Sequence, residues 1–473
     1  MGRFAPRGVP VGNHGYRSFA TGAFLATVLV CLSVPSVAAD ESGSRLSRAE
    51  AIDLALDRNL DLRIALEEVE RARGTRLVRR APGVPSVSVS GSYELRDRAL
   101  IDRAPDDFGD RDPETVDPPP DSEVPISRES VRLRGEIRQL LFAGFEQYFR
   151  GRASDEELRS AVLRARNTAN NVVRDVRVAF ERVLWIREAV ASREKTLANA
   201  RRLEELVRGR AAGGQAIEYE IARARINRSR AEVDLKRERI RLEEAVSRLA
   251  DRIGLSSERR GSLEVEGRCR PLVGELPAFP PVEEALAGNW RVRSLDSAIE
   301  AARHSVRSEQ ASLSPRVEGY ANYQYNSSYY DFGERLHGWA AGVAVRWDLF
   351  DGFARRGRVR SSLAEKRSAE WERRSFVSSF ERAYANVRDE LARSREILEA
   401  ETDSLALAEE SLGQVRELFE RGRIDVEPVV RNENQVLEAR LRRAEAVFRL
   451  NSAWFQYESL LGVYRDKISR LAR

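Results

Sequence analysis

The sequence contains few of the side chains that carry enzyme or metal chemistry. Its three histidines, His14, His304 and His337, are far apart, and the 473 residues include two cysteines and one methionine. A metal site needs several His, Cys or acidic ligands at a fixed spacing, and a covalent catalyst needs a nucleophile beside a base. The sequence shows neither pattern. We therefore expect no enzyme activity, no metal and no other cofactor.

Charged residues instead recur at every second position of short segments. In VRLRGEIRQLL (131–141) they alternate with apolar or small residues, and residues 85–95, 316–325 and 339–349 alternate in a similar way. A period of two places one set on each face of a β-strand. The sequence therefore predicts four strands with one polar and one apolar face. The charged residues selected from this pattern are Arg132, Arg134, Glu136, Arg138, Arg316, Glu318, Arg346 and Asp348.

These strands have the length of membrane-crossing strands. About ten residues suit a tilted strand in a bilayer, and the apolar faces carry aromatic residues near their ends. A soluble sheet with one wet face is the alternative. Four strands cannot close a barrel, and open edges are not tolerated in lipid. The chain must then assemble with copies of itself, because two copies supply eight strands and three supply twelve, with room for a pore.

The first 39 residues are typical of a secretory signal. A basic segment precedes an apolar stretch at 19–34, and small residues at 37–39 offer a cleavage site. A membrane anchor is the weaker alternative, because polar residues and Pro35 interrupt the stretch. Val30 before Cys31 argues against lipid attachment. Cleavage would remove three Arg and no acid, so the net charge of +5 would become +5 − 3 = +2, which gives no reason to expect nucleic-acid binding.

The rest of the chain is an internal duplication. Asn59 matches Asn289 at an offset of 230, and Gly144 matches Gly352 at an offset of 208. The difference, 230 − 208 = 22 residues, locates an insertion in the first repeat. Residues 97–123 fill it with ten acids, three arginines and three consecutive prolines. This composition predicts a solvated loop.

Each repeat also predicts a long helix that turns and runs back. The first helix continues from Gly144 to about Arg208 without a proline, which is about 95 Å at 1.5 Å per residue. Apolar residues recur in steps of three and four in both repeats, as in helices that coil around neighbours. An ordinary coiled-coil stalk is the alternative for the helices alone. Gly-containing turns at 208–215 and 420–428 should meet in a tip far from the strands.

Several segments together resemble the TolC-type outer-membrane efflux proteins. They are AIDLALDRNLDLR (51–63), QLLFAGF (139–145), WDLFDGF (347–353) and the two segments that follow the turns. The duplicated order, rather than any single motif, carries the resemblance, and it covers nearly all of residues 45–462. The chain departs from the family where Leu60 replaces a frequent proline and where Phe145 and Phe353 replace a frequent second glycine.

The resemblance implies a mainly helical, internally duplicated protein with four transmembrane strands per protomer and long coiled-coil hairpins, closing as a trimeric β-barrel and α-barrel. The implied division is a signal peptide (1–39), an N-terminal periplasmic helical segment (40–82), a first β-hairpin (84–143) with extracellular loop 97–123, a first helical hairpin (144–254) with tip 208–216, a linker (255–281), a helix (282–313), a second β-hairpin (315–350), a second helical hairpin (351–462) with tip 420–428, and a C-terminal tail (463–473).

It also implies an outer-membrane channel with a periplasmic extension, in a Gram-negative type of cell. Such a channel is the passive duct of a tripartite efflux or type I secretion system for drugs, small molecules or proteins. The implied partners are two further copies of the chain, a periplasmic adaptor, an inner-membrane pump of the RND or ABC type and outer-membrane lipid. A periplasmic adaptor would instead have one helical hairpin flanked by β domains, and a coiled-coil structural protein would lack channel activity.

Three sets of residues follow from the resemblance. The charged strand residues given above would line the lumen. Acids near the tip would form rings in a trimer that select cations; they are Asp425, Glu427, Glu218 and Glu220. Glycines would allow the tight turns beside which an adaptor docks; they are Gly213, Gly214 and Gly422.

Overall fold

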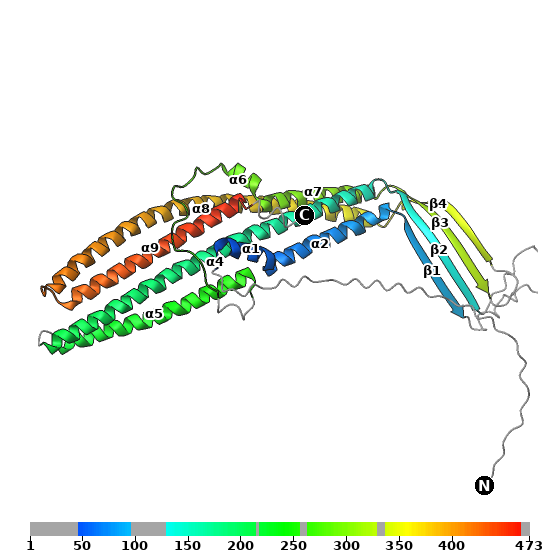
Figure 1. Cartoon of the computed structure of the whole chain (residues 1–473). Helices are drawn as coiled ribbons and strands as arrows, with labels where there is room; N and C mark the ends of the chain where they lie inside the picture. Colours follow the sequence, from blue (N-terminus) through cyan, green and yellow to red (C-terminus); the bar gives the residue numbers. More distant parts are fainter. Residues whose placement is uncertain (1–45, 96–128, 214–216, 256–262, 329–335, 465–473) are drawn as a thin grey trace, which may run out of the picture. The chain divides into compact units, whose positions relative to one another are not determined.

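The structure is a computed structural model. Contacts divide the chain into two compact units, Met1–Gly43 and Ser44–Arg473, and all described residues belong to the second unit. The predicted signal peptide, the acidic loop 97–123 and Gly214 lie outside the described residues. Helices and strands follow the duplicated order (Figure 1). The residues described are 46–95, 129–213, 217–255, 263–328 and 336–464.

The two repeats contain matching elements of nearly equal length. The two longest helices, one in each repeat, have 67 residues each, and the helices that return from them have 36 each. The first repeat consists of α1 (Arg48–Arg58), α2 (Leu60–Arg80), the short turn η1 (Ala81–Gly83), β1 (Ser86–Leu95), β2 (Glu129–Phe142), α4 (Glu146–Ala212) and α5 (Glu218–Ile253). The second consists of α6 (Val282–Gly288), α7 (Trp290–Ala311), β3 (Arg316–Ser328), β4 (Leu336–Arg346), α8 (Ala354–Glu420) and α9 (Val426–Leu461). Within the described ranges, no helix is long and apolar enough to span a membrane.

Equivalent asparagines break the chain between the two short helices of each repeat. The Asn59 side chain caps α2 by accepting from the Leu62 N–H at 3.1 Å, and its amide donates to the Arg252 carbonyl of α5 at 2.9 Å. Asn289 caps α7 in the same manner and donates to the Leu460 carbonyl of α9 at 3.2 Å. Each asparagine therefore fixes a helix start and ties it to the last turn of the returning helix.

The four strands form one antiparallel sheet in the order β1-β2-β3-β4. The central pair, β2 and β3, joins the two repeats, while β1 and β4 are the edges. A register shift between Leu140 and Phe142 marks a bulge at the end of β2. From the sheet the chain enters each long helix through a Gly-Phe pair in the left-handed region: φ is 58° at Gly144 and 63° at Gly352.

The long helices pack through the predicted seams. Val176, Val183 and Leu197 are buried along α4, as are Tyr384 and Leu391 along α8. The helix α4 packs against α5, α7 and α9, and α8 packs against α7 and α9. Two hydrophobic clusters lie at equivalent levels of the repeats, one formed by α1, α4 and α5 and the other by α6, α8 and α9. These clusters hold each hairpin together.

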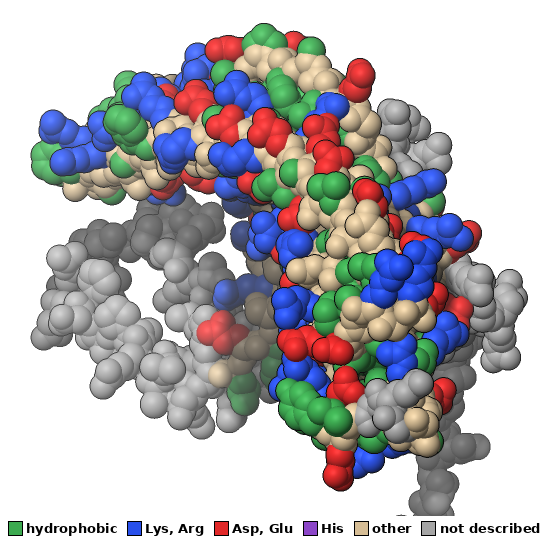
Figure 2. All heavy atoms as spheres, turned by 90° about the vertical axis from the view of Figure 1, so that its left-hand side faces the viewer, with side chains coloured by type: hydrophobic (Ala, Val, Ile, Leu, Met, Phe, Trp, Pro, Cys, Tyr) green, Lys and Arg blue, Asp and Glu red, His purple; other side chains and the backbone are tan. Residues whose placement is uncertain are grey.

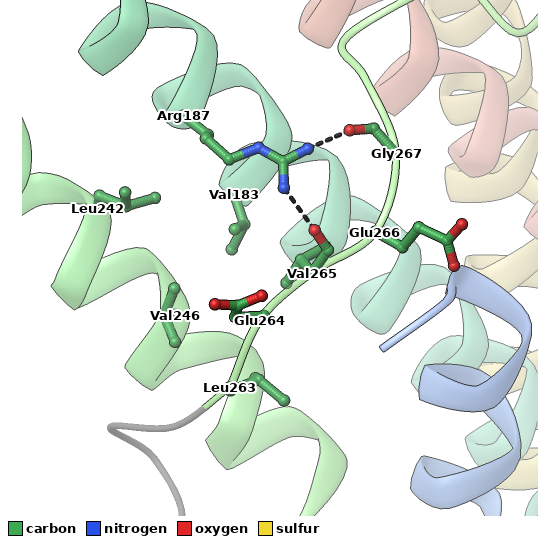
Figure 3. A pocket seen from close by; sticks show the side chains of 9 residues that line it. All are labelled: Val183, Arg187, Leu242, Val246, Leu263, Glu264, Val265, Glu266 and Gly267. Carbon is green, nitrogen blue, oxygen red and sulfur yellow. Dashed lines mark hydrogen bonds between the residues drawn. The ribbon is translucent and has the colours of Figure 1, made fainter. Parts of the chain in front are cut away.

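The linker between the repeats is fixed to the helices over its described part. Leu46 pairs with Val265 as a short parallel bridge. The Arg187 guanidinium donates to the carbonyls of Val265 and Gly267, beside a hollow of about 520 Å³ (Figure 3). The other side chains that line the hollow are apolar apart from Glu264 and Glu266, and Arg187 serves to hold the linker.

Candidate functional site

Over most of the sheet, polar side chains lie on one face and apolar side chains on the other; Gln139 and Leu140, beside the bulge, are exceptions. Directly paired residues of antiparallel strands lie on the same face, and Ser92 pairs with Arg132, which pairs with Asn326. The same reasoning places Val89, Leu133 and the other apolar residues together on the opposite face. Every predicted lumen residue that lies within a strand is on the polar face. These are Arg132, Arg134, Glu136, Arg138, Arg316, Glu318 and Arg346.

Polar contacts cross the polar face. Arg134 donates to Gln324 at 2.9 Å, and Arg138 lies 2.6 Å from Glu136 on its own strand. Arg132 lies 3.8 Å from Glu94, an acid of the same alternation that sequence reasoning left out. At the start of β3, beside the first turn of α4, Arg316 binds the buried Glu146 at 2.9 Å. The face is thus charged but internally paired in places.

The prediction for Asp348 as a strand residue is wrong. β4 ends at Arg346, and Asp348 follows it, 3.3 Å from the Arg346 Nε. The strand stops because the chain must turn into α8: the Trp347 indole donates to the Leu313 carbonyl, and the Arg355 guanidinium donates to the Asp348 carbonyl. Asp348 therefore belongs to the connection between β4 and α8.

The two helical turns come together at one end. A hydrophobic cluster there includes Leu203 and Val207 of α4, Phe419 of α8 and Val426 of α9. Arg210 donates to the Phe419 carbonyl at 2.9 Å and lies over its ring. Figure 2 views the molecule from this side and shows basic and acidic side chains intermixed on its surface. The turns thus form one tip, as the sequence predicted.

The four predicted tip acids have different environments. Asp425 is exposed at the start of α9 and forms no capping hydrogen bond with its side chain. Glu218 is exposed at the start of α5, and the Glu220 carboxylate accepts from the Ile217 N–H at 3.2 Å. Glu427 is 2.8 Å from Arg223 and 3.1 Å from Arg431, and these guanidinium groups hold the pKa of Glu427 below its usual value.

The turn glycines do not share one role. Gly422 has a φ of +71°, in the left-handed region that favours glycine. Gly213 has a φ of −88°, which any residue adopts, so its predicted need for glycine is wrong. It ends α4 as an ordinary C-terminal residue, and Gly214 lies outside the part described.

Two acids, Glu204 and Glu181, are buried in α4, and the sequence pattern drew attention only to the first. Glu204 interrupts the apolar seam of α4 and is held by Arg208 and Arg228, each at 2.6 Å. Its place in the seam made it noticeable. Glu181, on the same helix, binds Arg48 and accepts from the Asn451 amide at 2.9 Å. No sequence pattern links Glu181 to Asn451, because the two occupy different repeats at non-equivalent positions. In the described ranges no group of three or more His, Cys, Asp or Glu could hold a metal ion.

Comparison with known proteins identifies the same architecture. Residues 282–463 match the family described as outer membrane efflux protein. Outer membrane protein OprJ of Pseudomonas aeruginosa is 24% identical over 372 residues, which are 76% of this chain and 71% of OprJ.

Solved structures share the fold. The CmeC outer membrane channel of Campylobacter jejuni has a TM-score of 0.76 at 13% identity, covering 90% of this chain and 89% of CmeC. The outer membrane protein VceC of Vibrio cholerae has a TM-score of 0.70 at 17% identity, covering 88% of this chain and 96% of VceC. The predicted fold class of long helical hairpins joined to a small antiparallel sheet is confirmed.

Proposed function

Because this chain belongs to the outer membrane efflux protein family and is an efflux channel of the outer membrane, we propose that three copies close around a common axis to form its duct. Their twelve strands would form a barrel in the membrane, and their long helices would continue it through the periplasm. One observation carries this proposal. Within one protomer the two repeats pack together through an α4–α7 interface, and the equivalent surfaces on α2 and α8 are exposed, as if each awaited the other from a neighbouring copy.

The complete interface joins α4 of the first repeat to α7 of the second. The Ser160 hydroxyl donates to the Ser294 carbonyl at 2.9 Å, and Phe149 stacks on His304 with ring centres 6.2 Å apart. The α7 residues that face α4 recur in steps of three and four, and most are buried. They are Trp290, Ser294, Ser297, Ala301, His304 and Ser308.

The matching stripe of α2 is exposed. Residues 230 positions earlier in the chain have the same place on α2 that the α7 stripe has on its helix, yet each is open to solvent. They include the large apolar side chains Leu60, Ile64 and Val78, which are 71%, 62% and 72% exposed. A stripe of this kind on a surface helix predicts a packing partner. The full set is Leu60, Ile64, Glu67, Arg71, Gly74 and Val78.

The partner stripe lies on α8. Adding 208 to the α4 positions that face α7 gives a line of small residues with a tryptophan at its end, all exposed. Small side chains allow close approach of two helices. We therefore propose that α2 of the next copy packs on α8 as α7 packs on α4, with β1 of that copy beside β4. The line is Ala354, Gly357, Ser361, Ala364, Ser368 and Trp371.

Three copies, rather than two, give a duct. Eight strands make a barrel that side chains fill, whereas twelve leave an aqueous interior. In this arrangement the polar strand face, with Arg132, Glu136 and Arg138, lines the lumen. The tips then meet a periplasmic adaptor and an inner-membrane pump of the RND or ABC type. Exposed Ile217 and Tyr219, beside the turn of the first hairpin, supply apolar contact for the adaptor.

Disulfide cross-linking tests the arrangement directly. In a Cys269→Ser background, Gly74→Cys with Gly357→Cys should link copies, because these positions are the equivalents of His304 and Phe149. We expect covalent dimers and trimers in isolated envelopes after oxidation, and nothing larger. His304→Cys with Phe149→Cys is the matched control and should give only an internal link in the monomer.

Failure of the glycine pair to link while the control pair links would overturn the proposed interface. Single-channel recording in a planar bilayer tests the duct itself. Purified protein without conductance would contradict the open lumen, whatever its state of association.

A further inference from the structure

We propose that the groove at the start of α8 binds the phosphate headgroup of a phospholipid from the periplasmic leaflet of the outer membrane. The groove has a volume of about 800 Å³ and lies between the end of α7, the connection after β4 and the first turns of α8. The proposal rests on the proposed function, in which the sheet lies in the outer membrane. The groove is then at the periplasmic edge of that membrane.

One wall of the groove is apolar and open. Leu349, Phe350 and Phe353 line it and are 74%, 74% and 67% exposed, with Leu313 opposite them. The Phe350 and Phe353 rings meet edge to face at 5.4 Å. Trp347 joins this wall to the end of the apolar strand face by donating to the Leu313 carbonyl at 3.1 Å. The wall therefore continues the surface that faces lipid chains.

The other wall is cationic. Arg355, Arg356, Arg360 and Arg367 line the groove. The Nε of Arg355 is buried without a hydrogen-bond partner. For the guanidinium groups of Arg356, Arg360 and Arg367, no acidic partner is found in the described part of the chain.

Nearby acids do not neutralise this wall. Asp351, the acid that lines the groove, accepts from the backbone N–H of Arg355 at 2.8 Å and lies 3.3 Å from the Arg358 guanidinium. Arg358, on the neighbouring face of α8, also pairs with Glu309 at 3.3 Å. Arg356, Arg360 and Arg367 thus remain available, whereas the Arg355 guanidinium donates to the Asp348 carbonyl and Arg358, beside the groove, is paired with acids.

The chemistry of the two walls selects an anionic lipid. Arginine binds phosphate oxygens through planar, paired N–H donors, and basic residues at the membrane surface attract anionic lipids. Acyl chains need an apolar surface that continues into the bilayer. A free phosphate would use the arginines and leave the Leu349, Phe350 and Phe353 wall in water. A phospholipid covers both walls.

The first repeat provides an internal contrast. It keeps Arg152 and Arg159 at the positions of Arg360 and Arg367, but it has Gln147 and Tyr148 at those of Arg355 and Arg356, and Asp155 replaces Leu363. Asp155 binds Arg76 and Arg80 at 2.7 and 2.6 Å, so its charge is already compensated. We therefore expect one lipid site per chain, in the second repeat.

The groove stays open in the proposed trimer. In the first repeat Arg152 and Arg159, the equivalents of Arg360 and Arg367, stay exposed although α4 is packed on α7, and Arg356 lies about 100° or more around α8 from Ala354 and Gly357. Lipid binding and self-association consequently use adjacent parts of the α8 surface with no residue in common, and one can fail without the other.

Native mass spectrometry of the full chain in detergent tests the site with phosphatidylglycerol as the probe. We expect Arg356→Gln with Arg360→Gln and Arg367→Gln to lower retained phosphatidylglycerol about tenfold, because three phosphate contacts are lost. Arg152→Gln with Arg159→Gln, at the equivalent places of the first repeat, is the matched control and should retain it. Diacylglycerol, which lacks phosphate, should not be retained by any of the proteins.

Equal retention by the wild type and the triple variant would overturn the site. Equal loss in the triple variant and the control variant would also overturn it, since lipid would then bind basic residues without selection. If excess inorganic phosphate displaced the lipid completely, the apolar wall would play no part and the phospholipid assignment would be wrong. Cross-linking through Gly74→Cys and Gly357→Cys shows in parallel that each variant still assembles, and the single Arg360→Gln variant replaces the triple one if it does not.

Discussion

Phe145 and Phe353 stand in the same left-handed backbone conformation, with φ 67° and ψ 5°, immediately before the two longest helices. Each follows a glycine that is also left-handed, and each ring packs edge to face on a phenylalanine three residues earlier, at 6.3 and 5.4 Å. A positive φ is unfavourable for a residue with a bulky side chain. The change from strand to helix is therefore made twice by the same strained pair.

Substitution at either phenylalanine should show that strain. Phe145→Val and Phe353→Val should each lower stability by about 1 kcal/mol relative to the corresponding Asn variant, since asparagine tolerates the left-handed region and β-branched residues do not. Thermal dissociation of the purified assembly would measure this. Equal behaviour of the Val and Asn variants would show that φ is not the controlling factor.

The buried acid Glu204 should be replaceable only together with its partner. Leu412 and Val436 stand 208 positions after Glu204 and Arg228, so Glu204→Leu with Arg228→Val copies the second repeat into the first. Arg228→Val alone removes a partner from a buried carboxylate and should cost about 1–3 kcal/mol. Glu204→Leu alone should cost less, because Arg228 is a third exposed and keeps Glu232 at 2.8 Å.

The double variant should unfold close to the wild type, as a denaturant series would show. A double variant less stable than either single one would contradict the equivalence of the two seams.

Asn451 should be essential for holding the linker. Its amide donates to Glu181 and to the Arg270 carbonyl, and its oxygen accepts from the Leu272 N–H at 3.0 Å. Asn451→Ala leaves these groups unpaired and should cost about 2–4 kcal/mol. Limited proteolysis should then cut within residues 263–281. Glu243→Ala, at the equivalent exposed position of α5, is the control and should change neither property.

Acid should loosen the tip. The hydrogen bond from Arg223, with that from Arg431, lowers the pKa of Glu427 from 4.5. Because the folded-state pKa is lowered, the stabilising contribution is complete above the unfolded value of 4.5 and is lost as the pH falls through the lower folded value. Spin labels at Ile217→Cys and Arg421→Cys, without Cys269, should separate below pH 4.5. In a Glu427→Gln background their distance should no longer depend on pH.

We expect Asp425, and after it the equally exposed Glu218, to be the tip acids that bind cations. Both are exposed, whereas Glu427 is paired and Glu220 caps a helix. Three copies would bring three Asp425 carboxylates around one axis, so Asp425→Ala should weaken block of the channel by trivalent cations. Single-channel recording measures this, with Glu218→Ala as the comparison. Unchanged block in Asp425→Ala would remove Asp425 from the gate.

The sequence was most informative where a pattern repeats. Alternation placed Arg132, Arg134 and Arg138 on one face, and the strand register agrees. The seam of α4 was legible even through Glu204, because its neighbours in steps of three and four are apolar. The fold class followed from these periods together with the duplicated order.

Contacts that occur once were not predictable. Among the described residues, the Glu181 and Asn451 pair and the Arg187 contacts with the linker have no counterpart in the other repeat, and the α8 groove has one only for Arg360 and Arg367. The end of β4 was placed too late because Asp348 continues the alternation after the hydrogen bonds of the strand have ended. Gly213 was given a turn role on residue type alone, which its φ of −88° does not require.

Because α4 and α8 have the same length, 67 residues each, their two turns lie at the same distance from the sheet. Removing seven residues from one would draw one turn back by about 10 Å and leave the rim uneven, while the same cut in both would keep it flush. Changes in the depth that the protein can reach must therefore arise in pairs, one in each half of the gene product.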